Sequence, residues 1–426
     1  QYVEWNEYDY PYLQSNTTFE EIIDSLAFNA TENSDIRITY RNDKDGRPYI
    51  YIVNIGQPTS IKLTAKGYKS FESYDILKDE YKVIDGDLDF EQSQSYILYL
   101  SNKDVEIKKE LQPISLEGPY KIIDEVRNCL TLDYAKYSLD GINYSDSIHH
   151  MGIFNELLEK RYKGDLYVKY EFQVKDIPSI CSTIVEDSHV QSVSINGQLV
   201  ELKAIVMDNE FREYDIAKYL KEGKNEITIL MNYEQNEDVY YALFGENVTE
   251  SLKNCLAYVT NIEAIYLLGN FGVYGEFTQG KQENILLGSN FYIGKQKKEI
   301  NSLIEDGYPF FFGDIKVRKE IEVDDINKYL NIDGRFHLLE VSVNNQPSDI
   351  MMFTKKLDLS NKLQVGKNTL DVTLTIGKRN QMGPFHTKEQ EDYGVGPYTF
   401  ERFGTWKNGK SSIMRDDSYS FIKTII

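Results

Sequence analysis

The sequence contains few of the residues from which metal sites and disulfide frameworks are built. Among its 426 residues there are three cysteines and five histidines. Cys129, Cys181 and Cys255 are too widely spaced to form a metal knuckle or a disulfide framework. We therefore expect buried free thiols, no metal centre and no cofactor, with the exception of a structural calcium ion that is considered below.

A long apolar run and an excess of positive charge are also absent. No stretch reaches the roughly 20 apolar residues of a membrane-spanning helix, so we expect a soluble chain without a membrane partner. The net charge of −21, from 68 acidic against 47 basic residues, repels phosphate backbones and argues against nucleic acid as a partner. Neutral sugars and proteins are not repelled by such a field. These properties do not set the compartment, and we expect a soluble bacterial protein that is either cytoplasmic or secreted.

What the sequence does contain is an internal repeat. Residues 193–230 include VSINGQLV and FREYDIAKYLKEGKNEITIL. Most of this block recurs as VSVNNQPS at 341–348 and LDLSNKLQVGKNTLDVTLTI at 357–376. The second halves of the two copies align without a gap, and two units of one β-rich fold are the simplest explanation.

Each part of the block predicts a local structure. An alternating run ends in Asn196-Gly197, which favours a two-residue hairpin turn. Asp215 is placed to cap one helical turn, and Gly223 is placed to end it. The alternating residues that follow resume a strand. We interpret the block as a folding signature that carries no chemistry of its own.

Alternating runs extend the β pattern over most of the chain. Residues 36–40 and 49–55 are typical of strands, and Asp45-Gly46 between them favours a hairpin. One helical stretch is expected at 154–162. We predict a mostly β chain with an N-terminal segment and β-sandwich at 1–111, a first jelly-roll β-sandwich at 112–302 and a second at 303–426.

The repeat is similar to the galactose-binding-like jelly roll that serves as a sugar-binding domain in family 2 glycoside hydrolases. NCLTLDYAKYSLDG, IYLLGNFGVY, GYPFFFG and KRNQMGPFH, in this order, resemble the C-terminal region of large alpha-L-rhamnosidase-like (family 106-like) glycoside hydrolases. DGRPYIYIVNIGQ resembles the β-sandwich that follows the catalytic barrel in such enzymes. The resemblance covers most of the chain and implies that both jelly rolls are galactose-binding-like.

The resemblance further implies that catalysis lies outside this chain. In those enzymes the acid and base carboxylates belong to an upstream (β/α)8 barrel, and no strand–helix alternation long enough for a barrel occurs here. The sequence begins at Gln1 rather than Met, so we expect a fragment or a processed product. The expected function is a non-catalytic, carbohydrate-binding or supporting region. Its implied partners are a neutral carbohydrate and an upstream catalytic domain.

The first candidate for a carbohydrate-binding edge is the segment that begins at Arg379. Arg379 and Asn380 offer directional hydrogen bonds, as does His386, and Phe385 offers a ring for a sugar face. The family pattern has paired histidines at the end of this segment, and Phe385 replaces the first of them. A role that needs both histidines is therefore in doubt. The alternative is a structural corner in which Arg379 pairs with a local acid.

Tyr308 is the second candidate, because it opens the aromatic run YPFFF, which suits the apolar faces of pyranose rings. Packing within a core or a domain interface is the commoner use of such a run. Calcium would find carboxylates in loops at Asp140-Gly141 or at Asp85-Gly86-Asp87, although neither loop follows the EF-hand pattern.

Two other functions stay open. A self-sufficient glycosidase on a β scaffold would need two facing carboxylates about 5 to 10 Å apart. Adjacent acids such as Glu186-Asp187 and Asp416-Asp417 supply pairs, but none lies in a recognisable motif. The second alternative is a purely structural module that docks another protein.

Overall fold

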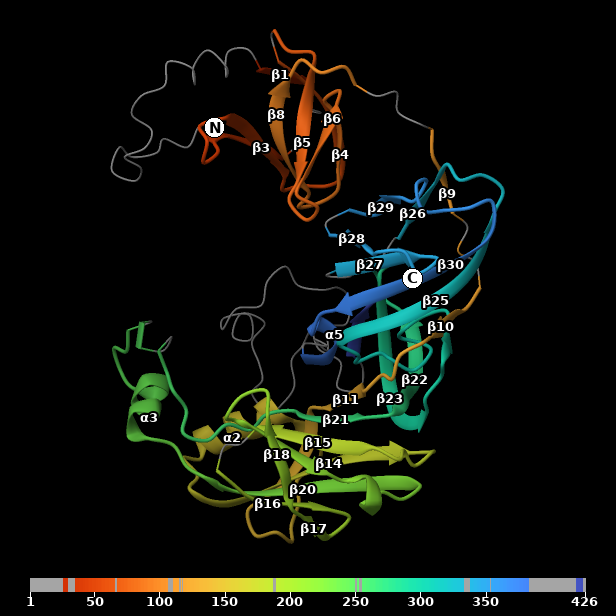
Figure 1. Cartoon of the computed structure of the whole chain (residues 1–426). Helices are drawn as coiled ribbons and strands as arrows, with labels where there is room; N and C mark the ends of the chain where they lie inside the picture. The colour runs from red at the N-terminus through yellow and green to blue at the C-terminus, as the bar shows by residue number, and fades with distance from the viewer. Residues whose placement is uncertain are drawn as a thin grey trace. The chain divides into compact units, whose positions relative to one another are not determined.

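The computed structural model is built mainly from strands (Figure 1). It describes residues 26–29, 35–65, 67–105, 110–114, 116, 118–186, 189–249, 251–252, 255–332, 338–352, 354–382 and 419–423. Most pairings between its strands are antiparallel, and the predicted mostly β, sandwich-type fold is confirmed. Within these ranges, no helix has both the length and the apolar character that crossing a bilayer requires.

Internal contacts divide the chain into two compact units. The first comprises Gln1–Ser115, Ile321–Ile332 and Glu340–Asn368, and the second comprises Leu116–Glu320, Asp333–Leu339 and Thr369–Ile426. The division runs within strands β25 (Gly313–Val323) and β30 (Gly366–Ile376). The three ranges predicted from the sequence stay a prediction.

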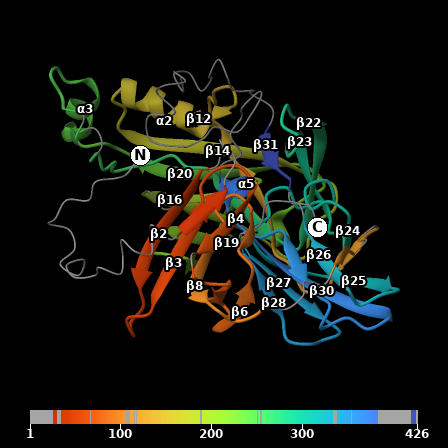
Figure 2. The ribbon, with the colours of Figure 1, turned by 90° about the horizontal axis from the view of Figure 1, so that it is seen from above.

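The N-terminal sandwich consists of two sheets. The five-stranded sheet has the order β2 (Ile36–Asn42), β3 (Pro48–Asn54), β8 (Ser95–Ser101), β5 (Ser70–Asp75) and β6 (Glu80–Ile84), and Figure 2 shows its first three strands side by side. The three-stranded sheet has the order β1 (Leu26–Asn29), β4 (Thr59–Ala65) and β7 (Asp87–Phe90). Ile50, Leu63 and Leu98 lie fully buried in the core that the two sheets share. Asn42 pairs with Pro48, so the predicted hairpin exists but has a longer loop than a two-residue turn.

The first copy of the repeat lies in a second sandwich. One sheet has the order β13-β12-β14-β20-β16-β17, with β12 (Tyr134–Ser138), β13 (Ile148–His149), β14 (Gly164–Val174), β16 (Val190–Ile195), β17 (Gln198–Val200) and β20 (Gly223–Tyr233). The other has the order β11-β21-β15-β19-β18, with β11 (Asn128–Leu132), β15 (Cys181–Glu186), β18 (Leu202–Val206), β19 (Phe211–Asp215) and β21 (Ile265–Gly269). Inward side chains of both sheets form one hydrophobic core.

Three further strands extend the first of these sheets. They are β22 (Phe271–Gln279), β23 (Ile285–Lys295) and β31 (Tyr419–Ile422). β23 pairs with β22 and β31 in the antiparallel sense, and it also pairs in parallel with the end of β14. Segments far apart in the sequence therefore meet along β23.

The second copy repeats the strand order of the first. A six-stranded sheet has the order β24-β10-β25-β30-β27-β28, with β10 (Tyr120–Ile122), β24 (Glu299–Ile300), β27 (Leu338–Val343) and β28 (Asp349–Met351). A three-stranded sheet contains β29 (Lys356–Asp358), β26 (Lys328–Asn331) and β9 (Gln112–Pro113). The order β12-β14-β20-β16-β17 of the first copy corresponds to β10-β25-β30-β27-β28, so the predicted duplication is confirmed.

The turns of the repeat have the predicted geometry. Asn196 and Gly197 join β16 to β17 with φ angles of 50° and 81°, as a two-residue hairpin of this type requires. Asn344 and Asn345 repeat this conformation, with φ angles of 52° and 58°. The Asp215 carboxylate accepts a hydrogen bond from the Ala217 N–H at 3.2 Å and begins a 3-10 turn. The predicted hydrogen bond from Asp215 is therefore present, but Ile216 occupies the N-cap position of the turn and makes no side-chain cap bond.

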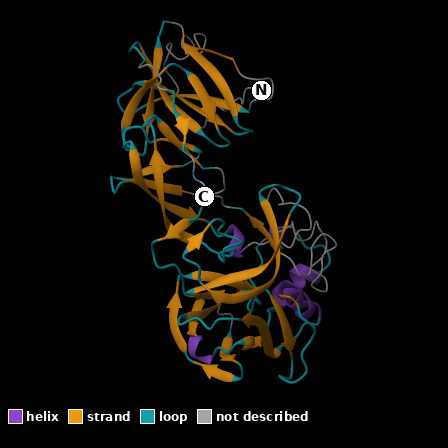
Figure 3. Cartoon of the chain, turned by 90° about the vertical axis from the view of Figure 1, so that its right-hand side faces the viewer, coloured by secondary structure: helices purple, strands orange, loops and turns teal. Residues whose placement is uncertain are grey.

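The described helical segments are few (Figure 3). They are α2 (His150–Glu159), the 3-10 turn η1 (Ala217–Tyr219), α3 (Glu237–Phe244) and α5 (Arg379–Met382). α2 corresponds to the helix predicted at 154–162, but it begins earlier because the His149 side chain caps it by accepting from the Met151 N–H at 3.3 Å.

Two of the three cysteines are buried free thiols, as expected. Cys129 and Cys181 lie in the core of the first jelly roll. Cys255 is exposed, and the expectation of burial was wrong for this residue. Its position after α3 lies outside the sheets, which a pattern of isolated cysteines does not disclose.

Candidate functional site

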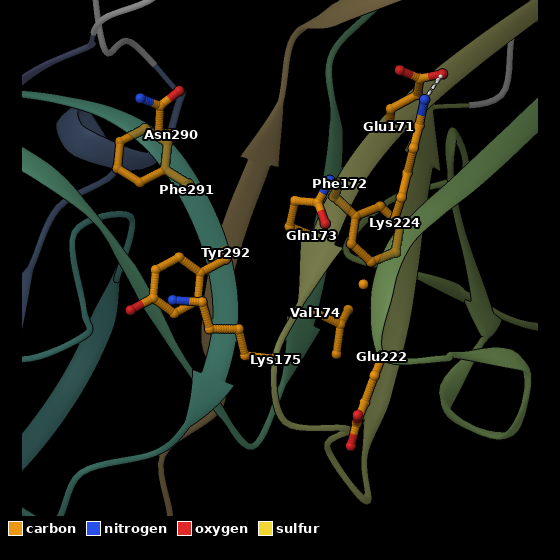
Figure 4. A pocket seen from close by; sticks show the side chains of 11 residues that line it. Glu171, Phe172, Gln173, Val174, Lys175, Glu222, Lys224, Asn290, Phe291 and Tyr292 are labelled. Atoms are coloured by element: carbon orange, nitrogen blue, oxygen red, sulfur yellow. Dashed lines mark ion pairs between the residues drawn. The ribbon is translucent and has the colours of Figure 1, made fainter.

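A groove of about 700 Å³ opens beside the end of β14 (Figure 4). Its lining comes from three segments: residues 171–175, residues 222–224 at the start of β20, and residues 290–292 in β23. The volume lies within the usual range for small-molecule sites. All three segments belong to the second unit, so the groove is formed within one compact body.

Strand register explains why these side chains meet. Gln173 pairs with Lys224 of β20 on one side and with Tyr292 of β23 on the other. Residues paired across strands project from the same face of a sheet, so an amine, an amide and an aromatic ring stand in one row. Glu171 lies two residues before Gln173 and projects from the same face. The alternation of β14 buries Phe172 and Val174 beneath this row.

Charges in the groove are balanced. Lys224 pairs with Glu171 at 2.8 Å, and Lys136 approaches the same carboxylate at 3.3 Å. Burial acts to raise the pKa of Glu171, but the hydrogen bonds from the two lysines outweigh it and hold this pKa below its usual value. Glu171 is therefore ionised at neutral pH, which suits it to accept hydrogen bonds and not to donate a proton as a general acid.

Tyr292 presents an aromatic face in the groove. The Lys175 Nζ lies 3.5 Å from the centroid of the Tyr292 ring, and the Tyr274 ring lies 5.7 Å away. Lys175 is itself exposed, so its long side chain is free to move aside and donate to a ligand. The ring and the amine together offer an apolar face bordered by a hydrogen-bond donor.

Sequence reasoning did not find this groove. The alternation of β14 marks Glu171 and Gln173 as outward-facing, but it does not show which strand lies next to them. The parallel pairing of β23 with β14 brings together positions more than a hundred residues apart. The sequence offers only a weak signal, the residue type at Asn290: asparagine adopts positive φ more readily than most residues, and the structure gives Asn290 a φ of 53°.

The structure places the first two predicted site residues in α5, away from the groove. The Arg379 guanidinium donates to the Ser420 carbonyl at 3.1 Å. The Asn380 amide donates to the Ile422 carbonyl at 2.9 Å and accepts from the Ile422 N–H at 3.0 Å. Both residues thus bind β31, and Asn380 is buried. Phe385 and His386 lie outside the described residues.

Tyr308 is only 2% exposed. Its hydroxyl donates to the Lys297 carbonyl at 2.6 Å, and its ring packs edge-on against Phe311. The ring is therefore packed in the interior, which was the alternative interpretation of this aromatic run. Tyr308 and the two α5 residues are not brought into one described site.

The Asp140 carboxylate, one expected calcium ligand, is engaged within its own loop. It accepts from the N–H groups of Ile142 and Asn143 at 2.8 Å each and from the Ser138 hydroxyl at 2.8 Å. The backbone hydrogen bonds are the largest cause of its lowered pKa. No group of three or more His, Cys, Asp and Glu side chains is arranged for a metal ion in the part of the chain that the structure describes.

The carboxyl group of Glu263 has a pKa near neutrality. Burial raises the pKa of Glu263 to about 7, and the nearby charge of Glu186 adds to this effect. Of the adjacent acids noted in the sequence, Glu186 lies in β15, whereas Asp187, Asp416 and Asp417 lie outside the described residues. Glu263 precedes β21 and does not line the groove.

The partly buried carboxyl of Glu263 predicts a pH-dependent stability. The folded chain keeps its proton up to about pH 7, whereas the ordinary pKa is 4.5. Between these values the folded state binds more protons than the unfolded state, so stability falls as pH rises. Glu263→Gln should therefore leave the melting temperature unchanged near pH 4 and stabilise the protein by about 2 kcal/mol at pH 8. Calorimetry at the two pH values measures this, and equal effects at both would contradict the assignment.

No family model matches the sequence, and no curated protein matches it either. Among solved structures, similar ones include a rhamnosidase from Novosphingobium sp. PP1Y (12% identity, TM-score 0.23, 57% of this chain and 25% of that chain). A second is a beta-D-mannosidase from Dictyoglomus thermophilum, with 13% identity and a TM-score of 0.24 over 59% of this chain and 31% of that chain. A third is the beta-glucuronidase of Ruminococcus gnavus, with 13% identity and a TM-score of 0.25 over 61% of this chain and 40% of that chain. The chain thus spans less than half the length of each of these enzymes.

Proposed function

We propose that this chain is a non-catalytic, carbohydrate-binding region of a larger glycoside hydrolase, and that the groove beside β14 binds a neutral glycan. The observation that carries the proposal is the row of Lys224, Gln173 and Tyr292 across three adjacent strands. An aromatic face suits the C–H face of a pyranose ring, while amide and amine groups suit its hydroxyls. The upstream catalytic domain is a further part of the proposal and rests on the sequence resemblance.

Electrostatics support a neutral ligand. Two lysines and two glutamates line the groove, so it offers no excess of either sign to a charged sugar. The whole chain carries a net charge of −21, which repels polyanions at long range. Uronic-acid polymers should therefore bind more weakly than neutral polysaccharides, and the difference should shrink as salt screens the field.

Replacing Tyr292 with alanine should weaken binding to neutral polysaccharides by about tenfold or more, because the stacking face and its buried area are lost. Affinity electrophoresis of the whole chain in gels with neutral polysaccharides would measure the loss. Tyr292→Phe keeps the ring and should retain most of the affinity. Tyr241→Ala removes an exposed tyrosine in α3, which does not line the groove, and serves as the matched control.

Three outcomes would overturn the proposal. A failure of every neutral polysaccharide and oligosaccharide to bind would favour the structural docking module. Hydrolysis of aryl glycosides by this chain, abolished by Glu263→Gln, would instead favour the self-sufficient glycosidase. Equal binding by the Tyr292→Ala and Tyr241→Ala variants would remove the groove as the site.

A further inference from the structure

Tyrosine side chains cover the outer face of the five-stranded sheet in the N-terminal sandwich. The inward positions of this sheet, such as Ile50 and Leu98, belong to the core that the two sheets share. Because successive side chains of a strand point to opposite faces, the residues next to them project outward. Five of the outward residues of β3, β5, β6 and β8 are tyrosines, and we call them the tyrosine face: Tyr49, Tyr51, Tyr74, Tyr81 and Tyr99.

Strand register brings these rings together. Tyr49 of β3 pairs with Tyr99 of β8, and the ring centroids lie 5.7 Å apart. Tyr74 of β5 pairs with Tyr81 of β6, at 4.9 Å. The Tyr81 and Tyr99 rings lie 5.5 Å apart, and aromatic rings attract each other at all these separations. Four rings therefore form one continuous row across the neighbouring strands β3, β8, β5 and β6, in which each ring is held by the next.

The two sides of the tyrosine face are open to solvent. Tyr81 is 50% exposed and Tyr51 is 38% exposed, whereas Tyr99 on the strand between them is 5% exposed. Single exposed aromatic side chains are ordinary on a protein surface, but a contiguous group of them marks a binding surface. Two strands separate β3 from β6, so the two exposed rings lie roughly 14 Å apart. A ligand that touches both must be longer than one sugar ring.

Arg47 lies over the covered middle of the row. Its guanidinium carbon is 4.2 Å from the centroid of the Tyr99 ring and 5.7 Å from that of Tyr81. It donates to the Glu72 carboxylate at 2.6 Å, and the Lys103 Nζ approaches the same carboxylate at 2.5 Å. Glu72 pairs with Tyr99 across strands, so its carboxylate projects from the tyrosine face. The ion pair and the rings together fix the orientation of the guanidinium.

Arg47 keeps donors for a ligand. A guanidinium carries five N–H donors. Among the described residues, the Arg47 side chain donates a hydrogen bond to Glu72 alone, and 43% of this side chain is exposed. Several planar N–H groups are thus accessible at the border of the Tyr81 ring. A guanidinium in such a position donates to two neighbouring oxygen atoms at once.

The chemistry of the tyrosine face suits a neutral glycan. A pyranose offers an apolar C–H face to an aromatic ring and hydroxyl oxygens to N–H donors. Glu72 balances the charge of Arg47, and the net charge of −21 on the chain repels polyanions. Arg37 and Arg41 also project outward, from the edge strand β2, so an acidic polysaccharide is the competing ligand that the test has to include.

We propose that the tyrosine face is a second carbohydrate-binding surface, which takes several consecutive residues of an extended neutral polysaccharide. Pyranose rings stack on Tyr51 and Tyr81, and hydroxyls between them accept hydrogen bonds from Arg47. The inference rests on the proposed class of ligand but not on the groove, because the face belongs to the first unit and the groove to the second. Affinity should depend on the length of the ligand, which a pocket for one sugar would not require.

The test uses the whole chain with Tyr292→Ala, so that the groove is weakened and the tyrosine face is measured. Calorimetric titrations with cello-, manno- and xylo-oligosaccharides should give, for at least one series, an affinity that rises about tenfold or more from disaccharide to hexasaccharide, because only long ligands reach both exposed rings. Adding Tyr81→Ala should remove this dependence and weaken hexasaccharide binding about tenfold. Tyr81→Phe keeps the ring and should retain the affinity, as should the control Tyr241→Ala in α3.

Arg47→Lys keeps a cation beside Glu72 but lacks the planar fork, so it should weaken hexasaccharide binding about fivefold. Hexasaccharide binding that Tyr81→Ala leaves unchanged would overturn the assignment while the groove stands. Two other results would also overturn it: polygalacturonate binding more tightly than every neutral glycan through Tyr81, or poly-L-proline binding there in place of any glycan. Binding that depends on Tyr81 and not on Tyr292 would instead remove the groove and keep the tyrosine face.

Discussion

Replacing Asn225 with alanine is expected to destabilise the protein by about 3 kcal/mol, through loss of several buried hydrogen bonds at once. Asn225 is fully buried at the start of β20. Its amide donates to the carbonyls of Lys221 and Gly223 at 2.7 and 3.0 Å, and its oxygen accepts from the Lys221 N–H at 3.0 Å. Alanine would leave these main-chain groups of the turn without their partner. Differential scanning calorimetry measures the loss as a lower melting temperature of the second unit.

The repeat supplies a second test of the same bonding pattern. Asn368, which aligns with Asn225, donates to Gln364 and Gly366 at 2.7 and 3.1 Å and accepts from the Gln364 N–H at 3.0 Å. Asn368→Ala should therefore have a similar effect. Asn209→Ala, at an exposed turn position, is the matched control and should change stability by less than about 0.5 kcal/mol. If Asn225→Ala lowered the stability no more than Asn209→Ala does, the role assigned to the Asn225 hydrogen bonds would be refuted.

Replacing Gly269 with alanine should have an even larger effect, because backbone occupies the space that a Cβ atom needs. A Cβ at this position would lie 2.1 Å from the Ile180 carbonyl oxygen and 2.9 Å from the Phe271 ring. Gly269 pairs with β11 and β15 on its two sides, so β21 is held in place and cannot move away easily. We expect a loss of more than about 3 kcal/mol, seen as a large fall in melting temperature or as failure to fold.

Gly197→Ala separates this steric effect from the conformational preference of glycine. Gly197 has a φ of 81°, but nothing lies within 4 Å of an added Cβ atom. The substitution should cost only about 1 kcal/mol, the usual strain of a left-handed alanine. If Gly269→Ala destabilised the protein no more than Gly197→Ala does, the tight contact between β21 and Ile180 would be disproved.

Local signals sufficed to predict the β class and the duplication, because each lies within one short stretch of sequence. The positive φ angles at Asn196 and Gly197 and the bond from the Ala217 N–H to the Asp215 carboxylate follow from the preferences of single residues. The bonds of Asn225 were not foreseen. Asn225 aligns with Asn368 in the repeat, but the sequence does not show whether an asparagine is buried or exposed.

The candidate sites depend on pairings that short-range patterns do not contain. The groove needs Tyr292 beside Gln173, and these residues are brought together only by the parallel pairing of β23 with β14. Conversely, Arg379 and Asn380 were singled out for their hydrogen-bonding groups, and these groups bind β31. Polar side chains that satisfy the main chain cannot be told from ligand-binding ones until their neighbours are known.

The bonds between α5 and β31 have a consequence for how this protein can diverge. Asn380 is bound to Ile422 through two hydrogen bonds, so α5 and β31 are tied together although the bonded residues lie 42 positions apart in the sequence. Both bonds depend on one side-chain amide, so a substitution of Asn380 would loosen α5 and β31 at the same time. Position 380 can therefore diverge only if another contact joins these two elements.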